Sequence, residues 1–224
     1  MERRLPAASR SLTLILKTSY TMYFDRNRDI DISFKSHLPH MHQDETMQFV
    51  TFRLADSLPK SVCQDFYDRV KLFKAANPEP WNRTVKLMYW KEFGPMQQQY
   101  LDNGYGECWL KYSACREILI DAIAFKDNVN YIVDSYVIMP NHVHILFQPI
   151  GMNKTESILH SIKSYSANKI NKLVGRSGKL WMKESFDRMI RDEDDHKRKY
   201  LYILENPKFL PDGWFTVYVR GEIS

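Results

Sequence analysis

The chain has few cysteines and no long hydrophobic run. Its three cysteines, Cys63, Cys108 and Cys115, are widely spaced among 224 residues, and no two of them form a CxxC pair. This spacing argues against a structural zinc site or a disulfide framework and favours a reducing compartment. No apolar stretch approaches the roughly 20 residues needed to span a bilayer, and the first residues lack the apolar core of a signal peptide. We therefore expect a cytoplasmic protein with no membrane partner.

Glycine is also sparse, and its placement excludes one class of site. The glycine-bearing segment over residues 101–109 (LDNGYGECW) is not a GxGxxG motif, so nothing predicts a nucleotide cradle. What the chain has is aromatic residues, with 13 Tyr, 12 Phe and 5 Trp, enough to bury the core of one globular domain. The formal net charge of +5 is compatible with nucleic acid, although many enzymes share that balance.

The hydrophobic pattern predicts interleaved strands and helices. Strands are expected over 47–54, 131–139, 142–148, within 180–190 and over 214–220, and helices over 60–75, 80–100, 110–125, 153–173 and 192–206. Asn153 and Glu156 have the spacing of a capping box for one helix, and Pro140-Asn141 predicts a hairpin between two strands. Antiparallel pairing with interleaved helices indicates the α+β class.

The most informative stretch is residues 137–147 (VIMPNHVHILF), which predicts a strand carrying two histidines two residues apart. Because strand side chains alternate, His142 and His144 share a face while Val143 points into the opposite layer. Two imidazoles side by side form half of a divalent metal site. An HxH pair alone is more often simply exposed to solvent or satisfied within the core.

A second constellation lies on the last predicted helix. Arg198, Tyr202 and Asn206 are spaced four residues apart and therefore share one face. Tyr202 is a candidate nucleophile and Asn206 a candidate oxygen ligand. A phenol, with a reference pKa of about 10, needs activation, and a divalent ion can polarise a phosphodiester. The alternatives are a packed helical tyrosine and an asparagine that merely ends the helix before Pro207.

Basic residues gather before and after Trp181. A surface that follows DNA phosphates is one interpretation and a solvated face is the other. For Arg188, pairing with Asp187 or Asp192 is a further alternative. The candidate DNA-binding residues are Lys163, Lys169, Lys172, Arg176, Lys179 and Arg188.

These motifs occur together in one known family. The run MPNHVH at 139–144 resembles the HUH motif of single-tyrosine transposases, and within them the chain resembles the REP-associated tyrosine transposases. Further similar segments are 49–59, 101–109, 164–172, 178–188 and the YILENP block at 202–207. The resemblance covers roughly residues 37–212. Departures are the stretch after Pro207, which differs from the family's usual sequence, and residues 1–36, which have no counterpart.

The resemblance implies a fold, a site and a substrate. The fold is a ferredoxin-like antiparallel sheet flanked by helices. His142, His144 and Asn206 are implied ligands of Mg²⁺ or Mn²⁺, and Tyr202 is the implied nucleophile, with Tyr200 and Tyr165 as competitors. The implied partner is single-stranded DNA with hairpin, repetitive palindromic elements. Relatives form homodimers with composite sites, which leaves open whether Tyr202 acts in its own subunit or in another.

Our hypothesis from the sequence is a metal-dependent transposase or endonuclease that cleaves and rejoins single-stranded DNA near hairpins through a 5′-phosphotyrosine. We expect an extension over 1–36, a transposase-like domain over 37–212 and a strand or tail over 213–224, in a nucleoid-associated protein. The main alternative is a domesticated, catalytically silent DNA-binding protein of the same fold. A hydrolase of small phosphoesters is a third option, without a pocket signal in the sequence.

Overall fold

The computed structural model describes residues 22–33, 40–82, 84–85, 88–89, 91–93 and 104–221. The predicted helix over 80–100 lies largely outside this set, and its described parts at 84–85, 88–89 and 91–93 are helical. The strands are β1 Asp31–Ser33, β2 His40–His42, β3 Gln48–Leu54, β4 Tyr131–Ile138, β5 His142–Pro149, β6 Trp181–Met189 and β7 Thr216–Val219. The helices are α1 Lys60–Ala76, a 3-10 turn Trp109–Lys111, α3 Ser113–Ala124, α4 Thr155–Leu173 and α5 Glu193–Glu205.

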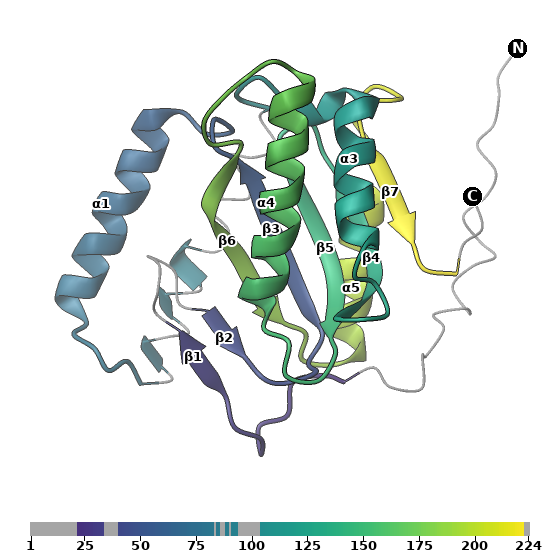
Figure 1. The fold of residues 1–224 in the computed structure, drawn as a ribbon. Helices are drawn as coiled ribbons and strands as arrows, with labels where there is room; N and C mark the ends of the chain where they lie inside the picture. Colours follow the sequence, from purple (N-terminus) through teal and green to yellow (C-terminus); the bar gives the residue numbers. More distant parts are fainter. Residues whose placement is uncertain are drawn as a thin grey trace, which may run out of the picture.

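Five strands form the central sheet in the order β6-β3-β5-β4-β7, and every neighbouring pair is antiparallel. Helices α3 and α4 cover one face, and α5 lies behind the sheet on the other face (Figure 1). The small β1–β2 sheet and α1 stand beside the β6 edge (Figure 1). The predicted α+β class, with an antiparallel sheet flanked by helices, is confirmed.

The strands β3 and β5 are buried on both faces because helices cover both sides of the sheet. On β5, Val143, Ile145 and Phe147 enter the core that α3 and α4 complete. The alternate residue Leu146 joins a second cluster with Phe49 of β3 and Ile203 of α5. The period-two alternation therefore sends the two histidines toward α5, away from the larger core.

Of the local signals in the sequence, the predicted hairpin turn is confirmed and the predicted capping box is wrong. Met139 N–H donates to the His142 carbonyl at 2.8 Å, which closes the predicted two-residue turn between β4 and β5. Asp192 caps α5 by accepting from Asp195 N–H at 2.7 Å. The predicted capping box at Asn153 does not form. The helix begins at Thr155, and Asn153 Nδ2 donates instead to the Ile150 carbonyl at 2.7 Å, a local turn that competes with the cap.

Segments from both ends of the sequence complete the sheet. Met22 and Phe24 make backbone hydrogen bonds of 2.9 Å with Met47 and Ile190. At the other end, β7 pairs with β4, so the sheet extends beyond residue 212.

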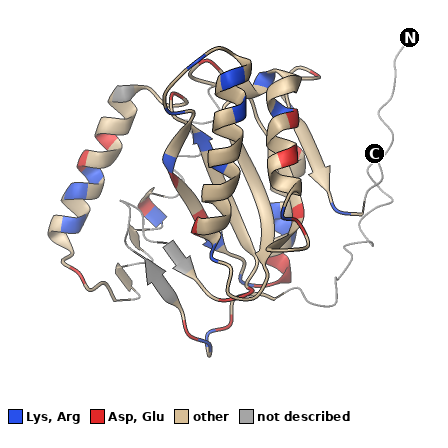
Figure 2. Cartoon of the chain, viewed as in Figure 1, with Lys and Arg blue, Asp and Glu red and all other residues tan. Residues whose placement is uncertain are grey.

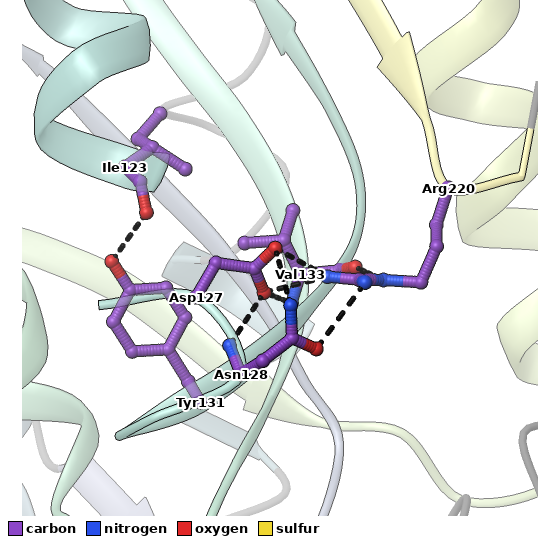
Figure 3. A network of polar contacts seen from close by, with 6 residues as sticks. All are labelled: Ile123, Asp127, Asn128, Tyr131, Val133 and Arg220. Atoms are coloured by element: carbon purple, nitrogen blue, oxygen red, sulfur yellow. Dashed lines mark hydrogen bonds and ion pairs between the residues drawn. The ribbon is translucent and has the colours of Figure 1, made fainter. Parts of the chain in front are cut away.

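A side-chain network fastens the end of β7. The Arg220 guanidinium donates to both Asp127 carboxylate oxygens, at 2.5 and 2.6 Å, and also to the Val133 carbonyl (Figure 3). In the same network, Tyr131 donates from its hydroxyl to the Ile123 carbonyl at 2.6 Å, which ties β4 to α3 (Figure 3). The edge strand β7 is therefore held by these side-chain contacts as well as by its backbone hydrogen bonds with β4.

Candidate functional site

The centre of the candidate site is the histidine pair on β5. Register places His144 opposite Thr51 of β3 and Val137 of β4, and His142 opposite Arg53 of β3. Residues directly opposite in a ladder share a face, so these side chains project together toward α5. Both imidazoles are buried, with exposed fractions of 1% for His142 and 0% for His144.

Each histidine is oriented through its Nδ1. His142 Nδ1 lies 2.7 Å from the Asn141 side-chain oxygen, and His144 Nδ1 lies 2.7 Å from the Thr51 hydroxyl. Asn141 is fixed in turn, because its Nδ2 donates to the Tyr105 carbonyl at 3.2 Å. An amide oxygen can only accept, so His142 carries its proton on Nδ1 and leaves Nε2 as a lone pair. Supporting contacts of this kind orient the imidazole ligands of metal sites.

The two Nε2 atoms face each other and the nucleophile candidate. His142 Nε2 lies 3.0 Å from His144 Nε2, and the Tyr202 hydroxyl lies 3.4 Å from His144 Nε2. The Tyr202 ring meets the His144 ring edge-on, with centroids 5.1 Å apart. The structure thus brings together three of the residues proposed from the sequence. Of the competing tyrosines, Tyr165 is exposed on α4, on the opposite side of the sheet, and Tyr200 packs in the second cluster.

Phe49 and Lys199 form the wall beside these groups. The Phe49 ring stacks on His144 with centroids 5.6 Å apart and meets Tyr202 edge-on. Lys199 places its ammonium 4.6 Å from the Phe49 centroid and 5.2 Å from the Tyr202 centroid. A cation over these rings adds positive charge beside the Tyr202 ring.

Burial keeps both imidazoles neutral. It lowers the pKa of His142 to about 3. The pKa of His144 falls well below its usual value, chiefly through burial and also through His142 and Lys199. Neutral imidazole is the form that binds a metal ion, so the pair is ready to act as a ligand at pH 7.

Asn206 follows Tyr202 by one helical turn. Its backbone N–H donates to the Tyr202 carbonyl at 3.0 Å, and its dihedral angles continue the helix. Its side-chain oxygen is buried and has no hydrogen-bond partner among the described residues. A buried acceptor without a partner is costly unless a bound group satisfies it.

The donor set is compatible with a divalent cation. Two Nε2 atoms 3.0 Å apart match neighbouring ligands of an octahedral ion, for which bonds of about 2.1 Å give a separation of about 3 Å. No group of three or more His, Cys, Asp or Glu side chains converges in the part of the chain that the structure describes. The remaining positions would therefore fall to the Asn206 oxygen, water or phosphate oxygens.

The residues expected to bind DNA divide into two groups. Lys169, Lys172 and Lys179 are exposed and Arg176 is half-buried, at the C-terminal end of α4 and in the following turn, where Figure 2 shows Lys and Arg on that end of the helix. Lys163 is placed differently. Its ammonium lies under β6 and donates to the Ser185 hydroxyl at 3.0 Å and to the Met182 carbonyl at 3.2 Å.

Arg188 lies on the site face of β6, opposite Phe49. Its guanidinium donates to Asp195, rather than to Asp187 or Asp192 as the sequence alternatives had it. Arg191 and Arg198 also pair with this buried carboxylate. Burial acts to raise the pKa of Asp195, but the hydrogen bonds from Arg188 and Arg191 and the charge of Arg188 outweigh it and lower the pKa to about 2. The shared carboxylate gathers three guanidiniums at the start of α5.

Comparison with known proteins agrees with the sequence resemblance. Residues 112–200 match the family model described as "Transposase IS200 like", a segment that holds both histidines and ends two residues before Tyr202. No curated protein gives a significant match. The chain is also similar to a solved structure of a REP-associated tyrosine transposase bound to a REP hairpin. It shares 17% identity, with 77% of this chain and 73% of that chain covered, at a TM-score of 0.42. At these values the likeness is no argument about function.

None of the described helices has the length and apolar character of a membrane span. The matched segment runs from α3 through β4, the histidine strand β5, α4 and β6 into α5. Residues 112–200 therefore carry the pattern of an IS200-like transposase, which agrees with the resemblance found in the sequence.

Proposed function

We propose that this protein cleaves and rejoins single-stranded DNA near hairpins, with Tyr202 as the nucleophile and His142 and His144 as ligands of Mg²⁺ or Mn²⁺. The observation that carries the proposal is the position of His144 Nε2, which lies 3.0 Å from His142 Nε2 and 3.4 Å from the Tyr202 hydroxyl. In the proposed step the phenol oxygen forms a bond to phosphorus and the bond to the 3′-oxygen breaks. The phenol loses its proton, the 3′-oxygen gains one, and the phosphate stays on Tyr202 as a 5′-phosphotyrosine.

The metal supplies charge stabilisation on the phosphate oxygens when it is bound. His142 and His144 would hold it, and the unpartnered Asn206 oxygen is the proposed third ligand. Thr51 is suited to orient His144 in either protonation pattern, because a hydroxyl both donates and accepts hydrogen bonds. It can donate to His144 Nδ1 when the proton sits on Nε2, and accept from Nδ1 when Nε2 must be free for the ion.

The surroundings of Tyr202 favour phosphate over other substrates. Lys199 lies over its ring, and Arg188, Arg191 and Arg198 gather at the start of the same helix. The exposed group Lys169, Lys172, Arg176 and Lys179 is the proposed contact for the hairpin backbone. We further propose that the protein acts in the cytoplasm at the nucleoid, and that the domain runs from the segment around Met22 through β7.

The test is cleavage of a hairpin oligonucleotide with a single-stranded flank, labelled at either end. With Mn²⁺, the 3′-labelled strand should become attached to protein in a denaturing gel, while the 5′-labelled strand should be released with an extendable 3′-OH. Tyr202→Phe should abolish the adduct, and Tyr200→Phe is the matched control that should retain it. An adduct that survives Tyr202→Phe would show that the nucleophile is another residue.

The same gel distinguishes the alternatives. Binding of the oligonucleotide without any adduct, with metal present, would indicate the catalytically silent DNA-binding protein. Cleavage without an adduct would indicate hydrolysis. His142→Gln and His144→Gln should both lose the adduct while retaining hairpin binding, because the histidines are assigned to the metal rather than to recognition of the DNA.

A further inference from the structure

Two loops beside the candidate site carry most of the exposed aromatic side chains. Among the described residues, six Phe, Tyr and Trp side chains are exposed, and four of them lie on residues 104–112 or 206–215. The four, called here the aromatic rim, are Tyr105 (43% exposed), Tyr112 (50%), Phe209 (88%) and Trp214 (44%). Large rings left in water at this density indicate a surface that meets a partner.

The first loop is attached directly to the histidine hairpin. The Tyr105 carbonyl accepts from Asn141 Nδ2 at 3.2 Å, and Asn141 in turn orients His142. Leu110 N–H donates to the Pro140 carbonyl at 3.1 Å. Tyr105 and Tyr112 are therefore held beside the turn that carries the metal ligands.

The second loop continues from the tyrosine helix, and one buried arginine joins it to the first. Lys208 N–H donates to the Glu205 carbonyl at 3.2 Å, so Phe209 follows closely after Asn206. Arg116, 6% exposed, donates to the Leu110 carbonyl at 2.9 Å and to the Gly213 carbonyl at 2.7 Å. The Arg116 guanidinium thus joins the two loops that carry the aromatic rim.

Each loop pairs an exposed ring with an ammonium group. Lys111 Nζ lies 5.0 Å from the Tyr112 centroid, and Lys208 Nζ lies 5.0 Å from the Phe209 centroid. A flat ring next to a cation is complementary to a base next to its phosphate. The loops also carry Glu107 and Asp212, so their net charge is zero. Stacking, more than charge, must supply the affinity of this surface.

We propose that the aromatic rim binds the single-stranded DNA that flanks the scissile phosphate, by stacking of bases on Tyr112 and Phe209 with Lys111 and Lys208 at the intervening phosphates. The inference rests on the proposed function, because it concerns the strand that Tyr202 attacks. It assigns to the rim a binding role that is separate from the metal and from the hairpin contacts on α4.

The test is binding of fluorescein-labelled oligo(dT), which has no hairpin, in EDTA so that no cleavage occurs. Tyr112→Ala and Phe209→Ala should each weaken binding by roughly fivefold or more. Phe209→Trp, which keeps a large ring at this position, should bind oligo(dT) with the affinity of the wild type. Phe125→Ala is the matched control, because Phe125 is 76% exposed and has the Lys126 ammonium 5.0 Å from its centroid. It lies at the opposite end of α3 from Tyr112, and its loss should leave binding unchanged.

The dependence of binding on salt separates stacking from charge. Phe209→Ala should lower affinity without changing the slope of log Kd against log salt, whereas Lys208→Gln should reduce that slope by about one. No binding of oligo(dT) by the wild type, or equal effects of Phe209→Ala and Phe125→Ala, would overturn the proposal. So would a change in oligomeric mass on Phe209→Ala with DNA affinity unchanged, which would make the rim a contact between copies.

The outcome is independent of catalysis. If the rim variants weaken oligo(dT) binding but the wild type forms no adduct with Mn²⁺, the proposed function fails and the binding surface stands. If the adduct forms normally and the rim variants bind oligo(dT) like the wild type, the binding surface fails and the proposed function stands.

Discussion

The Tyr202 hydroxyl lies 3.4 Å from His144 Nε2, across 58 residues of sequence. The contact exists because α5 lies on the same face of the sheet as the histidines, with Ile203 buried against Phe49 and Leu146. The proposed nucleophile and a proposed metal ligand therefore meet within one chain. In a composite site, Tyr202 and the histidines would come from two different subunits. The contact within one chain instead favours a Tyr202 that acts with the histidines of its own subunit.

A mixing experiment follows from this contact. Tyr202→Phe and the double variant His142→Gln/His144→Gln should each be inactive, and a mixture of the two should remain inactive, because neither chain holds a complete site. The measurement is adduct formation on the hairpin oligonucleotide after the variants are incubated together. Recovery of the adduct in the mixture would show that Tyr202 acts on a strand held by the histidines of another subunit.

Asn141 should control metal affinity through His142. Asn141→Ala removes the acceptor 2.7 Å from Nδ1, so we expect Mn²⁺ affinity to fall by about 10- to 100-fold. Asn141→Asp retains the acceptor but loses the hydrogen bond to the Tyr105 carbonyl, and should retain most of the affinity. Titration of Mn²⁺ by calorimetry or electron paramagnetic resonance checks both. Equal affinities for wild type and Asn141→Ala would contradict the assigned role.

Tyr23 should stabilise the helix that carries Tyr202. Its hydroxyl lies 3.3 Å from His196 Nδ1 on α5, and its ring packs in the cluster that contains Tyr202. Tyr23→Phe should lower the free energy of unfolding by about 1 kcal/mol and increase hydrogen exchange in α5. Tyr165→Phe, at an exposed position on α4, is the control. Unchanged protection of α5 in Tyr23→Phe would contradict this prediction.

Lys163 should make stability depend on alkaline pH. Burial, followed by the charge of Arg53, lowers its pKa from 10.5 to about 8. Between pH 8 and 10.5 the unfolded chain therefore holds a proton that the folded chain has released, so stability rises with pH across this window. The gain is at most roughly 3 kcal/mol.

Lys163→Met should lack this rise. The measurement is the urea midpoint of both proteins across the same pH range, so that other titrating groups cancel in the difference. Parallel curves for wild type and variant would show that the ammonium retains its ordinary pKa in the folded protein.

The sequence could predict what depends on local periodicity. His142 and His144 share a face by strand alternation, and Tyr202 and Asn206 share one by helical spacing. Thr51 could not be found in this way, because its contact with His144 requires the cross-strand register of β3 and β5. Asn141 was visible in the MPNHVH run, but its role depends on the side chain turning back onto His142. The hairpin over 139–142 was predicted because a two-residue turn leaves little freedom.

Lysines with similar sequence patterns have different surroundings in the fold. Lys163 and Lys169 both belong to the basic stretch on α4, yet Lys163 donates to backbone carbonyls of β6 while Lys169 is exposed. Sequence cannot separate them, because the difference arises from where β6 crosses the helix. Asn153 had the spacing of a capping box but bonds to the preceding turn, whereas Asp192, the first residue of the predicted helix over 192–206, caps α5.

The central claim is that Tyr202, and not its neighbour Tyr200, attacks the DNA. After reaction with a short oligonucleotide and Mn²⁺, trypsin should release residues 200–208 (YLYILENPK), which contain both tyrosines. Nuclease trimming leaves a nucleotide on the modified residue, and fragmentation in the mass spectrometer then locates it. We expect the added mass on Tyr202 alone. The mass on Tyr200, or an unmodified peptide from a protein that has cleaved its DNA, would contradict it.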